Sequence, residues 1–251
     1  MVRLGAIDSP PKTPCILGLE CAGEVEAVGE GVENFKVGDR VVALPEFKAW
    51  AELVTVPAKY VYHIPDEMSF ADAAAIAINY IVAYIILFDL ASIKPGKSVL
   101  LHSAGGGVGQ AIVQLARTVP NVQVFGVCSK NKHEALKAGG LIDHLLERGS
   151  DYTNEVRNLM GDTLSTCHHE RATLKKLLVS PGGKIKPTID STWALEDVAE
   201  AMQKMHDRKN IGKLILDPAM EPKPKPATPA KGKAKAKKEA SEEKNGEKEK
   251  K

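Results

Sequence analysis

Residues 98–109 read SVLLHSAGGGVG, an apolar run followed by a chain of small residues. The apolar run Ser98–His102 is typical of a strand buried in a parallel sheet. From Ala104 the small residues have the spacing A-x-G-x-x-G, a variant of the dinucleotide-binding fingerprint, and a helix is predicted over Gln110–Thr118. A strand, a glycine loop and a helix in this order predict the opening of a doubly wound α/β sheet.

The glycine loop is the strongest candidate for a binding site in the sequence. Small residues let the backbone turn tightly and approach a pyrophosphate, and the N-terminus of the following helix offers free N–H groups and a partial positive charge. A plainer explanation is also open, because a tight strand-to-helix turn can carry the same glycines and bind nothing.

The segment after the next strand bears on which dinucleotide would bind. That strand is predicted over Val122–Val127, and residues 128–132 then read CSKNK, with no carboxylate before Glu134. NAD sites usually place Asp or Glu about 20 residues past the loop to bond the ribose hydroxyls. A hydroxyl and two lysines suit a 2′-phosphate, so NADP is preferred over NAD. Two solvated lysines at a helix start are the simpler alternative.

Composition separates a globular body from a charged tail. The chain has 251 residues, 43% of them hydrophobic, and a net charge of +2. Pro218–Lys251 holds eleven Lys and six Glu, a larger positive excess than that of the whole chain, so the body is net acidic. Because the tail has no aromatic residue, it is expected to be disordered.

The remaining composition favours a cytoplasmic protein. None of the four cysteines has C-x-x-C spacing, which indicates free thiols in a reducing compartment. The first residues, MVRLGAIDSPPK, lack the apolar core of a signal peptide. Nucleic-acid binding is not expected, because no basic patch interleaved with aromatic residues is present.

The segment before the glycine loop is predicted to change from strands to a helix. Cys15–Pro57 has short alternating runs and glycine turns, which indicate a small antiparallel or barrel-like unit that includes a strand at Ala49–Pro57. Ala73–Phe88 is an apolar run of sixteen residues, predicted to be a core helix with Ser69 as its N-cap. A membrane span usually needs about 20 apolar residues, and Asp72 closely precedes this run.

Several segments resemble the zinc-independent quinone oxidoreductase (zeta-crystallin) subfamily of the medium-chain dehydrogenases/reductases. Gly96–Gly109, with Gln114 and Arg117, is similar to its signature. GLECAGEV and FKVGDRV, at 18–25 and 35–41, are similar to its GroES-like domain. Further similarity to the nicotinamide-side helix and to the C-terminal return lies at 79–84, 186–191 and 201–213. Within the subfamily, the chain most resembles the homologues of synaptic vesicle membrane protein (vesicle amine transport protein), particularly the homolog-like members.

The resemblance implies an α/β fold, with a GroES-like β-rich domain, a shortened Rossmann domain and a disordered C-terminal tail. The implied domains are an N-terminally incomplete GroES-like domain at 1–70 and an NADP-binding Rossmann domain at 71–179 that lacks its later strands. A return to the first domain follows at 180–217, and the tail at 218–251. About 80 residues separate Leu101 from Gly182, whereas a full doubly wound sheet needs about 140. Strands four to six are therefore expected to be lost, through a shortened isoform or an incomplete gene model.

The resemblance also implies the chemistry, which is hydride transfer from NADPH to a quinone or an α,β-unsaturated carbonyl. Zinc is not expected, because Leu19 stands where zinc-dependent relatives carry a histidine. Cys167-His168-His169 is expected to be an ordinary exposed segment, since three adjacent ligands seldom converge on one ion. No catalytic residue is assigned. The implied cofactor-binding residues are Gly106, Gly107, Val108 and Gly109 at the pyrophosphate, Ser129 and Lys132 at the 2′-phosphate, and Asn79 near the nicotinamide.

The alternative function is that of a non-catalytic adaptor on vesicles or mitochondria, as the associations of the resembled branch suggest. Lysines near an anionic membrane contribute about 1 kcal/mol each, although the glutamates interspersed in the tail reduce that attraction. A plain solubilising tail is the competing explanation. The expected partners are therefore a small-molecule quinone or enone, a second copy in a homodimer, and the surface of a vesicle or mitochondrial outer membrane.

Overall fold

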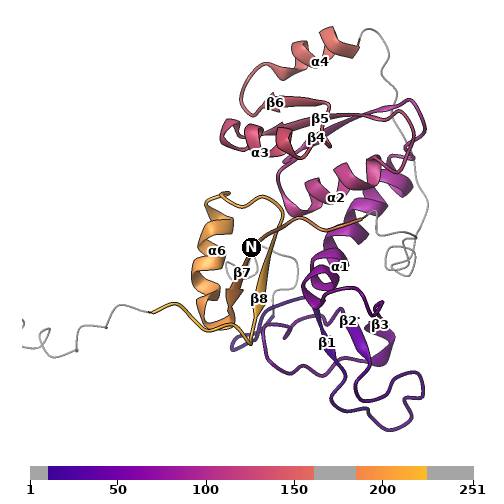
Figure 1. Ribbon diagram of the computed structural model, residues 1–251, viewed down its shortest axis with the longest axis vertical. Helices are drawn as coiled ribbons and strands as arrows, with labels where there is room; N and C mark the ends of the chain where they lie inside the picture. Colours follow the sequence, from indigo (N-terminus) through magenta and orange to yellow (C-terminus); the bar gives the residue numbers. More distant parts are fainter. Residues whose placement is uncertain (1–10, 161–184, 225–251) are drawn as a thin grey trace, which may run out of the picture.

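The computed structural model describes residues 11–160 and 185–224 (Figure 1). An antiparallel sheet has the order β1–β2–β3, a parallel sheet the order β4–β5–β6, and β7 and β8 form a separate parallel pair. The strands are β1 (Cys21–Glu24), β2 (Arg40–Ala43), β3 (Val61–His63), β4 (Ser98–His102), β5 (Gln123–Cys128), β6 (His144–Glu147), β7 (Ile189–Ala194) and β8 (Lys213–Asp217).

The helices connect these sheets. Figure 1 shows α1 between the antiparallel sheet and the parallel sheet, with α6 beside β7 and β8. The α-helices are α1 (Phe70–Tyr84), α2 (Gly107–Ala116), α3 (His133–Ala138), α4 (Tyr152–Met160) and α6 (Val198–His206). The shorter helical turns are η2 (Ala58–Tyr60), η3 (Ile85–Leu90), η4 (Lys130–Lys132) and η5 (Leu195–Asp197), of which η3 is a π-helix that continues α1.

The predicted strand–loop–helix–strand unit is confirmed. The chain runs β4–α2–β5–α3–β6, and all three strands are parallel. Helix α2 begins three residues earlier than predicted, because Gly106 is its N-cap with extended backbone angles (φ −83°, ψ 169°). The loop is therefore shorter than predicted, and its last glycines belong to the first turn of α2.

Helix α1 forms the centre of the main core. Its predicted cap is confirmed, since the amide of Asp72 donates to Ser69 Oγ at 3.0 Å. Ala73, Ala77 and Ala83 are fully buried, and small side chains let α1 pack closely against α2. The helical stretch Phe70–Leu90 is long and apolar enough to cross a membrane by length and composition, a test that a buried core helix also passes.

The two faces of the parallel sheet are covered unequally. Leu101 and Val124 belong to the core that contains α1 and α2, whereas Phe125 and Leu146 form a smaller cluster with Val156 of α4. Within the described residues β4 pairs with β5 alone. Leu100, beside Phe125 in the β4–β5 register, is 46% exposed. In the part of the chain that the structure describes, the sheet thus stops at β4, where a doubly wound fold would continue.

One predicted strand is wrong. Ala49–Pro57 contains no strand, although the amides of Lys48 and Trp50 donate to the carbonyls of Ile16 and Leu17. Lys48 has a φ of +77°, which interrupts an extended conformation just before this segment. Other sequence predictions, namely the cluster at 167–169, the later part of the segment 71–179 and most of the tail, lie outside the described residues.

The division into domains stays a prediction, and the structure describes the residues at two of the predicted boundaries. Helix α1 begins at Phe70, at the boundary predicted between the first two domains. Residues 218–224, the first part of the predicted tail, are described. Here the Lys223 amide donates to Asp197 Oδ2 at 2.9 Å, and Lys223 Nζ lies 3.8 Å from the centre of the Trp193 ring. A hydrogen bond to a carboxylate and a cation–π contact therefore hold Lys223, near the start of the predicted tail, against the folded body.

The smaller cluster should carry much of the stability of the shortened sheet. Leu146 is 1% exposed, so Leu146→Ala should lower the free energy of unfolding by about 2–5 kcal/mol, as core truncations do. Leu100→Ala is the matched control, because Leu100 is already 46% exposed and its truncation should cost under about 1 kcal/mol. Urea unfolding followed by circular dichroism measures both, and equal losses would contradict this packing.

Candidate functional site

The glycine loop joins β4 to α2 through one tight turn. Ser103 has a φ of +58°, and its carbonyl accepts the amide of Gly106 at 2.8 Å. Gly106, the N-cap of α2, has no side chain that could accept hydrogen bonds from the first backbone N–H groups of that helix. These groups carry the positive end of the helix dipole, which favours an anion.

Two glycines of the loop have close neighbours, which are backbone atoms at Gly109 and a side chain at Gly107. A Cβ on Gly109 would lie 2.4 Å from the carbonyl oxygen of Ser103. A Cβ on Gly107 would lie 2.5 Å from Nδ2 of Asn79, so the side chain of Asn79 reaches from α1 to the loop. Asn79 and the predicted pyrophosphate loop are thus neighbours, and Val108 beside them packs against the main core.

Two cationic side chains lie on the other side of the loop. A Cβ on Gly105 would lie 3.0 Å from Cδ of Lys132, and Lys132 Nζ donates to the carbonyl of Asn210 at 2.5 Å. Arg148 Nη2 donates to Ser103 Oγ at 3.3 Å. Burial lowers the pKa of Lys132, and the nearby charge of Arg148 lowers it further. An anion bound here would offset that unfavourable environment for the ammonium group.

The predicted site residues therefore converge on one edge of the parallel sheet. The glycine loop follows β4, Ser129 and Lys132 follow β5, and Arg148 follows β6. The carboxyl ends of parallel strands are where open α/β sheets bind ligands. Sequence analysis missed Arg148 and Asn210. No strand was predicted before Arg148, which directly follows β6, and Asn210 is brought close only by tertiary folding.

The C-terminal segment closes the loop from a third side. The amide of Gly212 donates to the Gly105 carbonyl at 3.1 Å, and Gly212 also forms an isolated parallel bridge with Gly106. Gly212 has a φ of +86°, and a Cβ there would lie 2.1 Å from the carbonyl oxygen of Thr188, so no other residue fits without rearrangement.

Asp190 holds this closing segment in place. Its Oδ1 accepts the Ile211 amide at 2.7 Å, and its Oδ2 forms an ion pair with Lys204 at 2.5 Å. Burial by itself would raise the pKa of Asp190, but the hydrogen bonds from Lys204, Ile211 and Ser191 together outweigh it and hold that pKa below its ordinary value.

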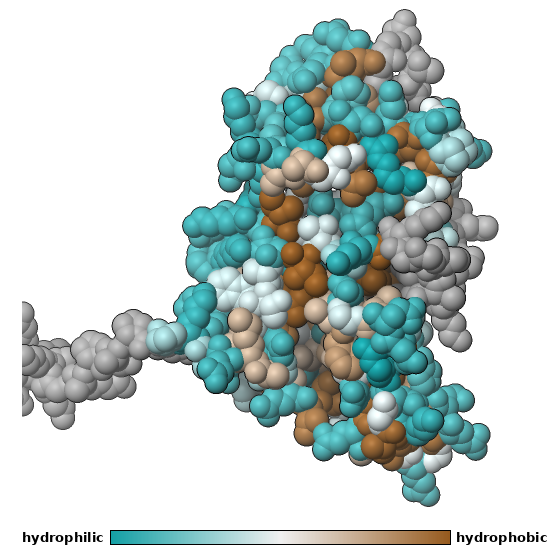
Figure 2. Space-filling view, viewed as in Figure 1, coloured by the Kyte–Doolittle hydropathy of each residue, from teal (hydrophilic) through white to brown (hydrophobic). Residues whose placement is uncertain are grey.

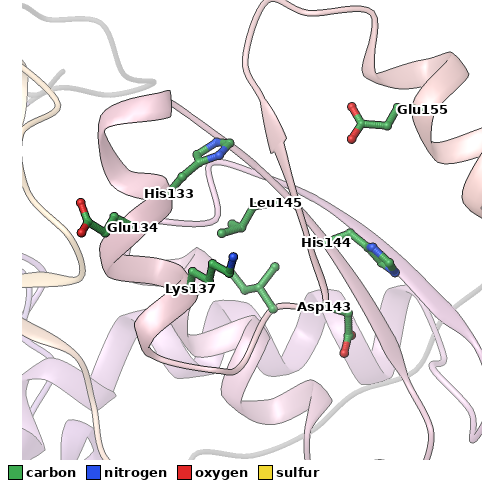
Figure 3. A pocket seen from close by; sticks show the side chains of 8 residues that line it. His133, Glu134, Lys137, Asp143, His144, Leu145 and Glu155 are labelled. Carbon is green, nitrogen blue, oxygen red and sulfur yellow. The ribbon is translucent and has the colours of Figure 1, made fainter.

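A separate hollow lies on the outer side of the sheet (Figure 3). It has a volume of about 550 Å³, and its side chains come from α3, from β6 with the residues just before it, and from α4. His133, Glu134, Lys137, His144 and Glu155 are among them. The residues predicted to bind the cofactor do not line it, so the glycine loop and not this hollow is the candidate site.

Comparison with known proteins agrees with this arrangement. Residues 1–66 match the alcohol dehydrogenase GroES-like domain, and residues 96–216 match the zinc-binding dehydrogenase family. Human synaptic vesicle membrane protein VAT-1 homolog-like is 40% identical over an alignment 303 positions long, which includes 89% of this chain and 72% of that protein. The chain belongs to the VAT-1 homolog-like branch of the medium-chain dehydrogenase/reductase superfamily.

Solved structures of this superfamily have the same fold. The crystal structure of the human VAT-1 homolog-like protein gives a TM-score of 0.79 at 44% identity, covering 88% of this chain and 85% of that chain. A quinone oxidoreductase from Pseudomonas syringae pv. Tomato DC3000 gives 0.73 at 26% identity, covering 86% of each chain. Mycobacterial Rv1454c complexed with NADPH gives 0.71 at 24% identity, covering 83% of this chain and 84% of that one.

These findings confirm the predicted family and fold class. The alignment with the human relative extends over 303 residues, more than the 251 of this chain, so the VAT-1 homolog-like relative carries residues that this chain lacks. Within residues 11–160 and 185–224, no group of three or more His, Cys, Asp or Glu side chains could hold a metal ion. Independence from zinc stays a prediction, as do the individual cofactor-binding residues.

The depressed pKa of Asp190 predicts how the closing segment responds to acid. Because the folded-state pKa lies below the unfolded one, the stabilisation is present above about pH 4 and is lost as the pH falls toward the folded value. Asp190→Asn should lower the free energy of unfolding by about 1–3 kcal/mol at pH 7, and by less near pH 3. Urea titrations at both values measure the difference.

Glu200→Gln is the control for that experiment, since Glu200 forms an ion pair with Lys223 but its side chain is 58% exposed. It should change the stability little at either pH. A deficit in Asp190→Asn that is equally large at both pH values would show that the charge of Asp190 does not hold the segment.

Proposed function

We propose that this chain is an NADPH-dependent reductase of the quinone oxidoreductase type, which transfers a hydride to a quinone or an α,β-unsaturated carbonyl without zinc. The observation that carries the proposal is the meeting of three features at one sheet edge: the glycine loop, Asn79 from α1, and the pair of cations Lys132 and Arg148. The similarity to a quinone oxidoreductase and to an NADPH-complexed protein of this fold supports it.

The residues at this edge fit the parts of NADP(H) in turn. The loop has no side chain at Gly106, Gly107 and Gly109, and the uncapped N-terminus of α2 suits a pyrophosphate. Ser129, Lys132 and Arg148 supply a hydroxyl and two cations for a 2′-phosphate. The acidic residue that NAD sites use after the second strand is absent, and Glu134 lines the outer hollow instead.

The chain's own residues then orient the reactants and exclude water. A bound nicotinamide cofactor supplies the hydride, so no acid pair or nucleophile is needed from the protein. Asn79, which lies beside Gly107, would supply an amide to the nicotinamide side of the dinucleotide. Leu19, which is 43% exposed, and Ile16, which is 51% exposed, offer apolar surface beside β1 that suits an apolar acceptor. Figure 2 shows further apolar residues at the surface in a band through the middle of the molecule.

Lys132 should decide the preference between the two dinucleotides. Lys132→Ala should lower the affinity for NADPH by about tenfold or more, because a charge-assisted contact with the 2′-phosphate is lost. The affinity for NADH, which lacks that phosphate, should change little. Titration of cofactor fluorescence measures both affinities.

Lys130→Ala is the matched control, since the other lysine of this turn has a side chain that is 79% exposed and already forms an ion pair with Glu147. It should leave both affinities close to those of the unmodified protein. Absence of saturable NADPH binding at millimolar concentration would contradict the proposed function, and equal losses for both cofactors would contradict the role of Lys132.

A second candidate function is that of a cytoplasmic adaptor bound peripherally to vesicle or mitochondrial outer membranes. The observation that favours it is that relatives are named synaptic vesicle membrane proteins, together with the lysine-rich sequence after Pro224. This candidate needs no cofactor, so it survives a failure of NADPH binding. A homodimer is compatible with either function.

The lysine-rich segment should act only through charge. Deleting residues 225–251 leaves the anchoring contacts of Lys223 intact and should weaken co-sedimentation with phosphatidylserine vesicles. Binding to neutral phosphatidylcholine vesicles serves as the control and should be weak before and after the deletion. Unchanged binding to the anionic vesicles would count against an electrostatic role for this segment.

A further inference from the structure

A single carboxylate joins three distant parts of the chain beside the glycine loop. Glu20, which directly precedes β1, has a side chain that is 12% exposed, and its Oε1 forms an ion pair with Nζ of Lys213 at the start of β8. Its other oxygen, Oε2, accepts a hydrogen bond from the backbone amide of Ile78 in α1 at 2.8 Å. Since Glu20 and Lys213 lie 193 residues apart in the sequence, only the fold brings them together.

The contact with Ile78 fixes the part of α1 that faces the loop. Backbone amides within a helix ordinarily bond to the carbonyl four residues earlier, so a carboxylate that reaches one from another element is a specific tertiary contact. The next residue, Asn79, is the one whose Nδ2 would lie 2.5 Å from a Cβ on Gly107. Glu20 therefore holds the backbone immediately before the residue that contacts the loop.

The contact with Lys213 fixes the opposite side of the loop. The residue before it, Gly212, donates its amide to the Gly105 carbonyl at 3.1 Å and forms the bridge with Gly106. The Lys213 side chain is 23% exposed, so both charges of the pair are largely removed from water. Loss of one partner would leave the other as a largely buried, uncompensated charge and would loosen both neighbours of the loop together.

We propose that Glu20 and Lys213 are positioning residues, whose ion pair holds Asn79 and Gly212 against the glycine loop and thereby sets the binding of the nicotinamide half of the dinucleotide. This inference rests on the proposed function and adds to it two residues that act on the glycine loop from outside it. The adenosine half would bind at another part of the same sheet edge, where Lys132 and Arg148 follow β5 and β6. The two halves can therefore be tested separately.

The test compares NADPH with 2′,5′-ADP, which has the adenosine and its phosphates but no nicotinamide. Lys213→Met should weaken NADPH binding by about tenfold, an ordinary size for coupling between sites, and leave the affinity for 2′,5′-ADP unchanged. Lys213→Arg keeps the cation and should bind NADPH like the unmodified protein. Isothermal titration calorimetry measures both ligands, and unchanged 2′,5′-ADP binding also shows that a variant is folded.

Two more variants keep the test decisive. If Lys213→Met does not fold, Glu20→Gln replaces it, because an amide oxygen still accepts the Ile78 amide and only the charge is lost. Lys223→Met is the matched control, a lysine of the same C-terminal segment whose side chain is 55% exposed in its ion pair with Glu200. It should change neither affinity.

The outcomes separate this inference from the proposed function. Selective loss of NADPH affinity in Lys213→Met, restored in Lys213→Arg, supports the positioning role. Equal losses for both ligands would show that the pair only supports the fold, and unchanged NADPH affinity would show that it positions nothing. Either result overturns the inference and leaves the proposed function standing. If the unmodified protein does not bind NADPH, both are overturned.

Discussion

Close backbone packing around Gly105–Gly109 is the constraint on which the rest of the structure depends. Asn79 approaches this loop from α1, Lys132 from the end of β5 and Gly212 from the start of β8. Lys132 and Asn79 use space that side chains on Gly105 and Gly107 would fill. The glycines therefore serve the tertiary structure as much as any ligand, because they let elements from across the whole sequence meet at one point.

The shortened sheet makes that meeting point more important. In the residues that the structure describes, the parallel sheet has three strands, and Leu100 on its edge strand is 46% exposed. Among the described residues the core around α1 and α2 is the larger of the two buried clusters, so it contributes the larger share of the hydrophobic stabilisation. The contacts of Glu20 with Lys213 and of Gln114 with the Lys186 carbonyl then join the C-terminal segment to this core.

The local part of this architecture could be predicted from the sequence. Apolar runs, glycine spacing and the Ser69 cap are local signals, and they correctly placed β4, α2, β5 and the start of α1. The strand predicted near Trp50 failed because an alternating pattern does not reveal the left-handed backbone at Lys48. The loss of strands four to six stays a prediction, which rests on the short spacing between Leu101 and Gly182 and with which the longer alignment to the human relative agrees.

The site could be predicted only in part. The glycine loop, Ser129 and Lys132 stand close together in the sequence, so their pattern carries information about a nucleotide. Arg148, Asn210 and the Glu20–Lys213 pair become neighbours of the loop only after folding. Parallel strands bring their carboxyl ends to one edge of the sheet, whatever the separation of the strands along the chain. A single sequence does not show which side chains from later segments will lie at that edge.

The central claim is that the glycine loop of this shortened fold binds a phosphorylated nicotinamide dinucleotide. Amide hydrogen exchange of residues 104–109 and 210–213, with and without NADPH, tests it most directly because it observes the loop itself. The account predicts slower exchange in both segments on addition of NADPH, and a smaller effect with NADH. Exchange that is the same with and without millimolar NADPH would contradict it.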